Sequence, residues 1–281
     1  MKYFLKIMRF IKNILPEWLR SFLYSITIKI MSRLPLLIIP FAFIFYGISV
    51  KLQDGNKFLI QYQGMKILSP KNSIDHIFCI NEIMKDRLYE QFVSIPKGGV
   101  VLDIGANVGI FTMIAAKEVG SSGLVLAIEP EPKNIGLLRK NIEINGIKNV
   151  IVLDKAISAR SGKVKLNLFH LTGFHSLIYP SDNQIEVEAK SLDDIVTELK
   201  LNRVDFIKID AEGSELEILK GGKNVLKSPN IKLSIAAYHK LEDGSPEFPQ
   251  IVSFLKERFF DINTKDNKFI YANHKISQTK T

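Results

Sequence analysis

Cysteine is almost absent from this sequence, because Cys79 is the only one in 281 residues. A single thiol excludes an intramolecular disulfide and a cluster of thiolate metal ligands. The shortage favours a reducing compartment, and we therefore expect a cytoplasmic protein. Hydrophobic residues make up 46% of the chain and charged residues 24%, which excludes a disordered chain and is typical of a folded one.

Long apolar runs are lacking as well. An uncharged stretch extends from Leu34 to Val50, but its 17 residues are at the short limit for crossing a bilayer. Pro35 and Pro40 weaken a straight helix there. A membrane-spanning segment is therefore disfavoured.

Basic residues concentrate at the N-terminus, where residues 1–33 carry seven Lys or Arg and one Glu, a net +6 of the chain's +9. Within residues 3–31 the apolar side chains recur at helical spacing, from Phe4 to Phe22, with basic side chains on the other side. We expect residues 1–47 to form an extension that attaches peripherally to the inner face of an anionic membrane. The alternative is that this apolar surface packs on the folded domain or on a second subunit.

The remaining residues carry only +3 and show no nucleic-acid-binding signature, so we expect no nucleic-acid partner. Residues 48–70 alternate around Asp54-Gly55-Asn56 and predict a β-hairpin, and residues 74–95 are typical of a helical lead-in. We place domain boundaries at 1–47, 48–98 and 99–281.

From Val100 onward, near-continuous apolar strands alternate with helices, which predicts an α/β fold with a doubly wound, Rossmann-like parallel sheet covered on both faces. The expected core strands are 100–104, 124–128, 150–153, 204–210, 232–237, 261–264 and 268–272, and the expected helices are 111–117, 134–145, 215–226 and 248–259. Residues 163–169 and 184–189 alternate every other position, and they predict an inserted antiparallel pair.

A glycine loop follows the first core strand, in the sequence Asp103-Ile104-Gly105-Ala106-Asn107-Val108-Gly109. Glycine permits a sharp turn and lets a ligand lie against the backbone. The third glycine of the dinucleotide fingerprint is missing, because Phe111 and Thr112 stand in its place. A pyrophosphate is therefore not the best-fitting ligand.

Two carboxylates accompany the loop. Glu129 ends the second strand about twenty residues after the loop, where a carboxylate accepts the hydroxyl protons of a ribose. Asp103 lies inside an apolar strand, where a carboxylate needs partners, so it either holds the loop or meets the cationic end of a cofactor. An adenosine carrying a sulfonium fits this combination, and the alternative for Glu129 is a solvated charge at a strand end.

These motifs resemble the FkbM-type branch of the class I S-adenosylmethionine-dependent methyltransferases. The resemblance rests on Asp103–Thr112, Glu129–Pro132 with Asn134, Asn141 and Asn145, Leu192–Asp194, and above all Val204–Glu215 with Leu219–Gly221. It implies a seven-stranded sheet, mostly parallel with one reversed strand. It also implies S-adenosylmethionine as cofactor and O-methylation of a hydroxyl on a sugar, glycolipid or secondary metabolite. A departure lies at Ala236-Ala237-Tyr238-His239, where many relatives carry a glutamate before the histidine.

The residues expected to bind the cofactor are Asp103, Gly105, Ala106, Asn107, Gly109, Phe111, Thr112, Glu129 and Ala156. On the acceptor side we expect Asp210 and His239 to be catalytic, supported by Lys208 and Glu212. Both Asp210 and His239 follow strands that are neighbours in the family's sheet order. A histidine of near-neutral pKa, oriented by a carboxylate, suits removal of a hydroxyl proton. We expect no metal, and a divalent ion held by Asp210, Glu212 and His239 is the lesser alternative.

Two other functions compete with this interpretation. A nicotinamide-dependent dehydrogenase shares the sheet but needs the fuller glycine fingerprint. A non-catalytic membrane-attached scaffold has little use for the grouped carboxylates at Asp210 and Glu212. Binding of S-adenosylhomocysteine without binding of NAD separates the first alternative from a methyltransferase.

Overall fold

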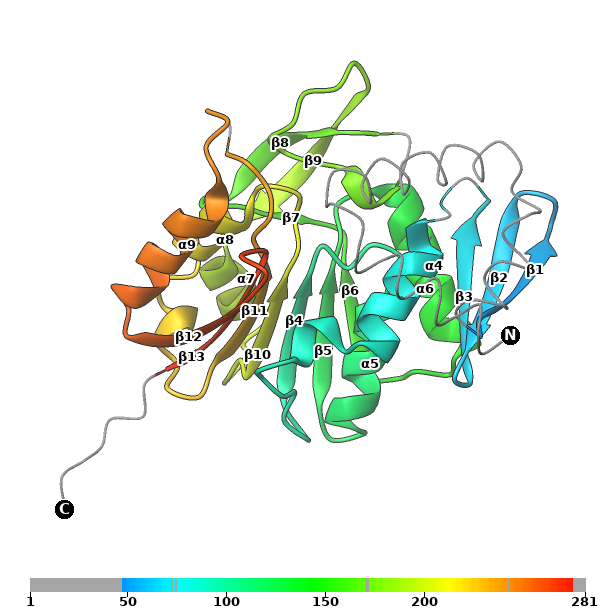
Figure 1. Cartoon of the computed structure of the whole chain (residues 1–281), viewed down its shortest axis with the longest axis horizontal. Coiled ribbons are helices and arrows are strands. Elements are labelled where there is room, and N and C mark those ends of the chain that lie inside the picture. The colour runs from blue at the N-terminus through cyan, green and yellow to red at the C-terminus, as the bar shows by residue number, and fades with distance from the viewer. Residues whose placement is uncertain (1–46, 72, 74, 170–171, 242, 275–281) are drawn as a thin grey trace, which may run out of the picture. The chain divides into compact units, whose positions relative to one another are not determined.

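The computed structural model describes residues 47–71, 73, 75–169, 172–241 and 243–274 (Figure 1). The chain divides into two compact units, one up to Asn81 and one from Glu82. Nearly all of the basic extension predicted at residues 1–47 lies outside the described residues. No helix in the described ranges is both long and apolar enough to cross a membrane.

The first unit contains an antiparallel sheet of β1 (Ser49–Gln53), β2 (Lys57–Tyr62) and β3 (Met65–Pro70). The predicted hairpin around Asp54–Asn56 is present, and a third strand extends it. The second turn consists of Gln63 and Gly64, both with positive φ, which is the geometry of a two-residue type I′ hairpin. The α-helix α4 (Asp75–Ile80) follows this sheet.

A short π-helical turn, η2 (Asn81–Lys85), and a 3₁₀ turn, η3 (Leu88–Glu90), complete the predicted helical lead-in. Tyr89, Val93 and Ile95 belong to an apolar cluster of the second unit. The structure therefore places residues 82–98 with the second unit, whereas the sequence grouped them with the hairpin.

The second unit is built on a seven-stranded sheet, in the order β12-β13-β11-β10-β4-β5-β6. Its strands are β4 (Val100–Ile104), β5 (Leu124–Ile128), β6 (Val150–Leu153), β10 (Phe206–Ile209), β11 (Lys232–Ala236), β12 (Phe260–Lys265) and β13 (Phe269–His274). β13 runs antiparallel to the other six strands, so the predicted sheet with one reversed strand is confirmed.

Helices cover both faces of this sheet, as the apolar strands predicted (Figure 1). Along β4 the side chains alternate, so that Leu102 and Ile104 face one layer and Val101 faces the other. The first layer contains α7 (Leu192–Glu198), α8 (Glu215–Lys220) and α9 (Glu247–Lys256). The second contains α5 (Ile110–Val119) and α6 (Pro132–Ile144).

The helix expected over 215–226 is shorter in the structure. It ends at Lys220 with Gly221 as its C-cap, and the 3₁₀ turn η5 (Val225–Lys227) follows. A Cβ on Gly221 would lie 2.4 Å from the carbonyl oxygen of Ser158, so the chain passes too close there for any other residue. Tertiary packing thus decides where this helix ends.

A small second sheet is inserted between β6 and β10. It contains β7 (Ala156–Ile157), β8 (Gly162–Asn167) and β9 (Gln184–Lys190), in the order β7-β9-β8. The antiparallel pair of β8 and β9 confirms the prediction, and β7 adds a short parallel strand. The 3₁₀ turn η4 (Thr172–Phe174) lies between β8 and β9.

Candidate functional site

A cavity lies at the carboxyl ends of β4, β5 and β10. The sheet order places β5 on one side of β4 and β10 on the other, so this is the point at which doubly wound sheets bind ligands. Six of the predicted site residues line the cavity. The lining residues are Ile104, Gly105, Asn107, Ile128, Glu129, Pro130, Lys155, Ala156, Ile157, Leu166, Gly173, His175, Leu177, Asp210, Ala211, Glu212 and Ser214.

The glycine loop makes a tight turn against its neighbours. Gly105, Asn107 and Gly109 all have positive φ, which glycine adopts without a steric penalty. A Cβ on Gly105 would lie 1.9 Å from the carbonyl oxygen of Asp210. The loop and the segment after β10 therefore meet so closely that only glycine fits at this position.

Buried charges support the loop from behind. Lys208 Nζ lies 3.2 Å from Asp103 Oδ1 and donates hydrogen bonds to the carbonyl oxygens of Ile104 and Gly105, at 3.1 and 2.8 Å. Thr112 Oγ1 donates to Asp103 Oδ2 at 2.5 Å. Burial favours the neutral amine, but the carboxylates of Asp103 and Asp210 outweigh it and raise the pKa of Lys208.

Several predicted residues thus lie behind the cavity. Lys208, Asp103 and Thr112 form this buried support, and none of the three lines the cavity. Phe111 belongs to the apolar core, where its ring packs edge-on against Tyr89 at 5.3 Å. Ala106 and Gly109 pack towards Leu138 of α6.

Glu129 lines the cavity, and its carboxylate accepts hydrogen bonds from the protein. Its Oε2 accepts the backbone N–H of Asn107 at 2.8 Å. Its Oε1 accepts the N–H of Glu131 at 3.1 Å and the side-chain amide of Asn134 at 3.3 Å. Burial of the side chain raises the pKa of Glu129 to about 7. Glu129 therefore connects the loop to the strand end and titrates in the physiological range.

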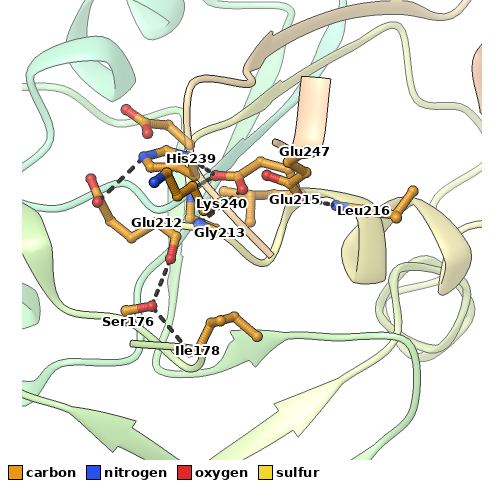
Figure 2. A network of polar contacts seen from close by, with 12 residues as sticks. Ser176, Ile178, Glu212, Gly213, Glu215, Leu216, His239, Lys240 and Glu247 are labelled. Atoms are coloured by element: carbon orange, nitrogen blue, oxygen red, sulfur yellow. Dashed lines mark hydrogen bonds and ion pairs between the residues drawn. The ribbon is translucent and has the colours of Figure 1, made fainter. Parts of the chain in front are cut away.

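His239 lies between two carboxylates (Figure 2). Its Nε2 is 3.3 Å from Glu212 Oε2, its Nδ1 is 3.1 Å from Glu215 Oε1, and its side chain is 5% exposed. Burial opposes protonation, but Glu215 and Glu212 outweigh it and raise the pKa of His239 to about 12. The imidazole is therefore a cation, which disagrees with the predicted base of near-neutral pKa, because the sequence did not reveal that two carboxylates would flank it.

Glu215 and Glu247 complete this cluster, and neither was expected from the sequence as a site residue. Glu215 accepts the N–H groups of Ala211 and Gly213, at 2.7 and 2.9 Å, and Glu247 Oε1 accepts that of Leu216 at 2.7 Å. Burial favours protonated Glu215, but His239 outweighs it and lowers its pKa to about 2. Burial and then Glu215 raise the pKa of Glu247 to about 9.

Glu215 and Glu247 differ in whether the sequence contained a signal for them. Glu215 belongs to the quoted motif after Val204, so its position was visible although its role was not. Glu247 comes from α9, far along the chain, and no local pattern pointed to it.

Asp210 lines the cavity, and one oxygen of its carboxylate is held by a hydrogen bond. Tyr89 Oη donates to Asp210 Oδ2 at 2.6 Å. Asp210 Oδ1 is buried and accepts no hydrogen bond from the residues that the structure describes. Tyr89 lies on η3, 121 positions away in sequence, and nothing local marked it as a site residue.

The cluster also has the composition of a metal site. Ligand atoms of Asp210, Glu212 and His239 lie within 4.8 Å of one another, as do those of Glu215, His239 and Glu247. Because each imidazole nitrogen faces a carboxylate, a divalent cation would compete with the imidazolium for the same oxygens.

Comparison with known proteins places the site in context. The Methyltransferase FkbM domain matches residues 103–262, more than half of the chain. Methyltransferase sdnD of Sordaria araneosa is 27% identical, over 69% of this chain and 85% of that protein. The 31-O-demethyl-FK506 methyltransferase FkbM of Streptomyces tacrolimicus is 24% identical, over 72% and 87%. The hexuronic acid methyltransferase AglP of Haloferax volcanii is 28% identical, over 47% and 53%.

Proposed function

Because this chain belongs to the FkbM methyltransferase family, we propose that it transfers the methyl group of S-adenosylmethionine to a hydroxyl oxygen of a sugar or small metabolite. S-adenosylmethionine is the cofactor, and methyl transfer is the activity of the family. The choice of oxygen as the methylated atom rests chiefly on one observation: Asp210 lines the cavity, and its Oδ1 accepts no hydrogen bond from the described residues.

The cavity suits a cationic ligand. Glu129, Asp210 and Glu212 line it, whereas the lysine in its wall, Lys155, is paired with Glu188 at 2.6 Å. A pyrophosphate would meet mainly carboxylates here, whereas the sulfonium and ammonium groups of S-adenosylmethionine would be attracted to them. This charge distribution supports a methyltransferase over a nicotinamide-dependent dehydrogenase. Glu129 would hold the ribose, and the loop around Gly105 and Asn107 would lie beside the amino-acid half.

Bound S-adenosylmethionine supplies an activated methyl group. The chain must then hold the acceptor oxygen in line with that group and take its proton. In our proposal Asp210 Oδ1 accepts the proton while Tyr89 keeps the carboxylate oriented through Oδ2. The oxygen–methyl bond forms as the sulfur–methyl bond breaks, and the products are a methyl ether, S-adenosylhomocysteine and protonated Asp210.

His239 has a positioning role in this scheme. Glu215 accepts two backbone N–H groups of the 211–213 turn, and His239 holds Glu215 and Glu212 together. The imidazolium thereby fixes the turn that carries Asp210 and Glu212 at the cavity. This replaces the predicted base role of His239 with one that its charge state permits.

The names of two relatives support an oxygen acceptor. One refers to a 31-O-demethyl compound and the other to a hexuronic acid. Both acceptors carry hydroxyl groups, and a cavity wall with an unpartnered carboxylate oxygen is suited to binding such a group.

The test is transfer of labelled methyl from S-adenosylmethionine to a panel of hexose and uronic acid glycosides and to polar metabolites from cells. We expect a product in which the label survives mild alkali, because methyl ethers resist it and methyl esters do not. Asp210→Asn should lower the rate by about 10²–10⁴-fold, the usual worth of base catalysis. Label in esters alone, or an Asp210→Asn enzyme of normal rate, would contradict the proposal.

A further inference from the structure

The inserted sheet carries a segment that the proposed mechanism does not use. Residues Gly173–Tyr179, here called the roof segment, lie between β8 and β9. Three of them, Gly173, His175 and Leu177, line the same cavity as Gly105 and Glu129. An insertion between β6 and β10 therefore forms part of the wall of the cofactor cavity.

His175 is the polar side chain that the roof segment contributes to the cavity. Its Nδ1 lies 3.0 Å from the backbone N–H of Phe169. A backbone N–H can only donate, so Nδ1 accepts and carries no proton. The ring proton is then on Nε2. Burial lowers the pKa of His175, which agrees with a neutral ring in this tautomer. His175 can therefore donate a hydrogen bond from Nε2 to a ligand in the cavity.

The position of His175 favours one half of the cofactor. The charged groups that influence its pKa most are Glu131, which caps α6, and Lys133 in the first turn of α6. Glu129, the expected ribose ligand, lies at the end of β5, and Pro130 also lines the cavity. His175 therefore shares the cavity wall with the segment that carries Glu129, where the ribose of the adenosine is expected.

Two side chains, Ser176 and Tyr179, hold the roof segment to the turns that follow β10 and β11. Ser176 Oγ donates to the carbonyl oxygen of Glu212 at 2.6 Å and accepts the N–H groups of Ile178 and Tyr179 (Figure 2). Tyr179 Oη donates to the carbonyl oxygen of Lys240 at 2.9 Å and lies 2.7 Å from its N–H. The same segment thus contacts the turn after β10 and the turn after β11.

We propose that the roof segment is a binding element for the cofactor, in which His175 donates its Nε2–H to an acceptor atom of the adenosine. Ser176 and Tyr179 are positioning residues that hold His175 over the cavity. This role of His175 rests on S-adenosylmethionine as the cofactor and does not depend on the acceptor hydroxyl. It can therefore be tested separately from the O-methylation proposed above.

Calorimetry with the full chain tests this without any acceptor. The probes are S-adenosylhomocysteine and 5′-methylthioadenosine, which shares the adenosine but lacks the amino-acid half. His175→Ala should weaken both probes by the same factor, about 5- to 20-fold, the scale of a lost hydrogen bond in a partly buried site. His175→Gln keeps an N–H donor at the end of the side chain, so it should recover most of the affinity for both probes.

His274→Ala is the matched control. His274 Nε2 contacts the carbonyl oxygen of Leu226, and Asn273 beside it pairs with Lys232 at the start of β11, so His274 lies at the end of the sheet opposite the cavity. This variant should bind both probes normally. Unchanged affinity of His175→Ala would overturn the proposal, and so would equal losses in His175→Ala and His175→Gln. A loss seen for S-adenosylhomocysteine but absent for 5′-methylthioadenosine would overturn the adenosine assignment.

Discussion

The carboxylate of Glu215 lies 3.1 Å from Nδ1 of His239, and the two side chains are 0% and 5% exposed. Water does not reach a charged pair that is buried to this extent, so it cannot solvate one charge when the other is removed. Removal of one charge therefore leaves the other buried and uncompensated, which costs about 3–5 kcal/mol in proteins.

We predict that Glu215→Gln lowers the free energy of unfolding by about 3–5 kcal/mol, because the imidazolium of His239 loses its nearest carboxylate. Urea denaturation at pH 7 measures this. Glu217→Gln is the control on the same helix, since Glu217 is 42% exposed and pairs with exposed Lys220. It should change stability by less than about 0.5 kcal/mol. Equal effects in the two variants would contradict a structural role for the Glu215–His239 pair.

A second prediction concerns Glu247 and pH. Its folded pKa is about 9 against an ordinary value of 4.5, so the folded chain holds a proton that the unfolded chain releases at neutral pH. The contribution of Glu247 to stability therefore falls as pH rises from about 4.5 towards 9. His239, with its pKa raised from 6.5 to about 12, adds to the decline above pH 6.5.

Denaturation between pH 7 and 9 should therefore show falling stability. Glu247→Gln retains an acceptor for the N–H of Leu216 and a donor towards Glu215, yet it cannot ionise. Its decline over this range should be shallower than that of the unaltered protein. Parallel curves would show that Glu247 is not protonated in the folded chain.

Cofactor affinity should depend on Glu129. We predict that Glu129→Ala weakens S-adenosylmethionine by about 1–3 kcal/mol, the scale of charge-assisted hydrogen bonds, as measured by calorimetry. Asp154→Asn, which alters a carboxylate that is 65% exposed, should bind normally. Unchanged affinity in a folded Glu129→Ala variant would remove Glu129 from the site.

The same residue predicts a pH dependence. Burial raises the pKa of Glu129 to about 7, so the carboxylate is protonated below this pH and ionised above it. The ionised form is the better acceptor for ribose hydroxyls, and affinity should therefore rise between pH 6 and 8. Calorimetry across this range should show a flatter profile for Glu129→Gln.

Tyr89 should matter for rate and little for cofactor binding. Tyr89→Phe removes the hydrogen bond that orients Asp210, and we expect kcat to fall about 10-fold while the Kd of S-adenosylmethionine is unchanged. Tyr271→Phe is the matched control, because it also removes a buried hydroxyl, which donates to the carbonyl oxygen of Leu88. If a chelator abolishes activity while Tyr89→Phe has a normal rate, a metal at Asp210, Glu212 and His239 is favoured instead.

Residues 1–47 remain the basis of a membrane prediction. A basic amphipathic helix gains apolar burial and about 1 kcal/mol for each basic residue near an anionic surface. The full chain should sediment with phosphatidylserine vesicles at low salt and be released at high salt. Failure to sediment at low salt would favour packing of this segment on the protein instead.

Much of the second unit could be predicted because its determinants are local. Parallel strands buried on both faces require continuous apolar sequence, so Val100–Ile104, Leu124–Ile128 and Val150–Leu153 have the same bounds in sequence and structure. The glycine loop was visible because a turn with positive φ selects glycine.

Which of the site residues line the cavity and which lie behind it could not be predicted from local sequence. Asp103, Lys208 and Thr112 come from a strand, another strand and a helix, and only their packing showed that they satisfy one another behind the loop. Phe111 was expected at the cofactor because of its place in the motif, but helical periodicity turns its ring into the core.

The sequence alone thus determined the type of sheet, the position of the glycine loop and the carboxylates available for chemistry. Only the tertiary structure decided the charge of His239, because that depends on Glu212 and Glu215, which lie in the segment after β10 and are distant from His239 in sequence. A pKa is set by groups within a few ångströms, and neighbours in space are not neighbours in sequence. For the same reason Tyr89 and His175 joined the site only when the chain was folded.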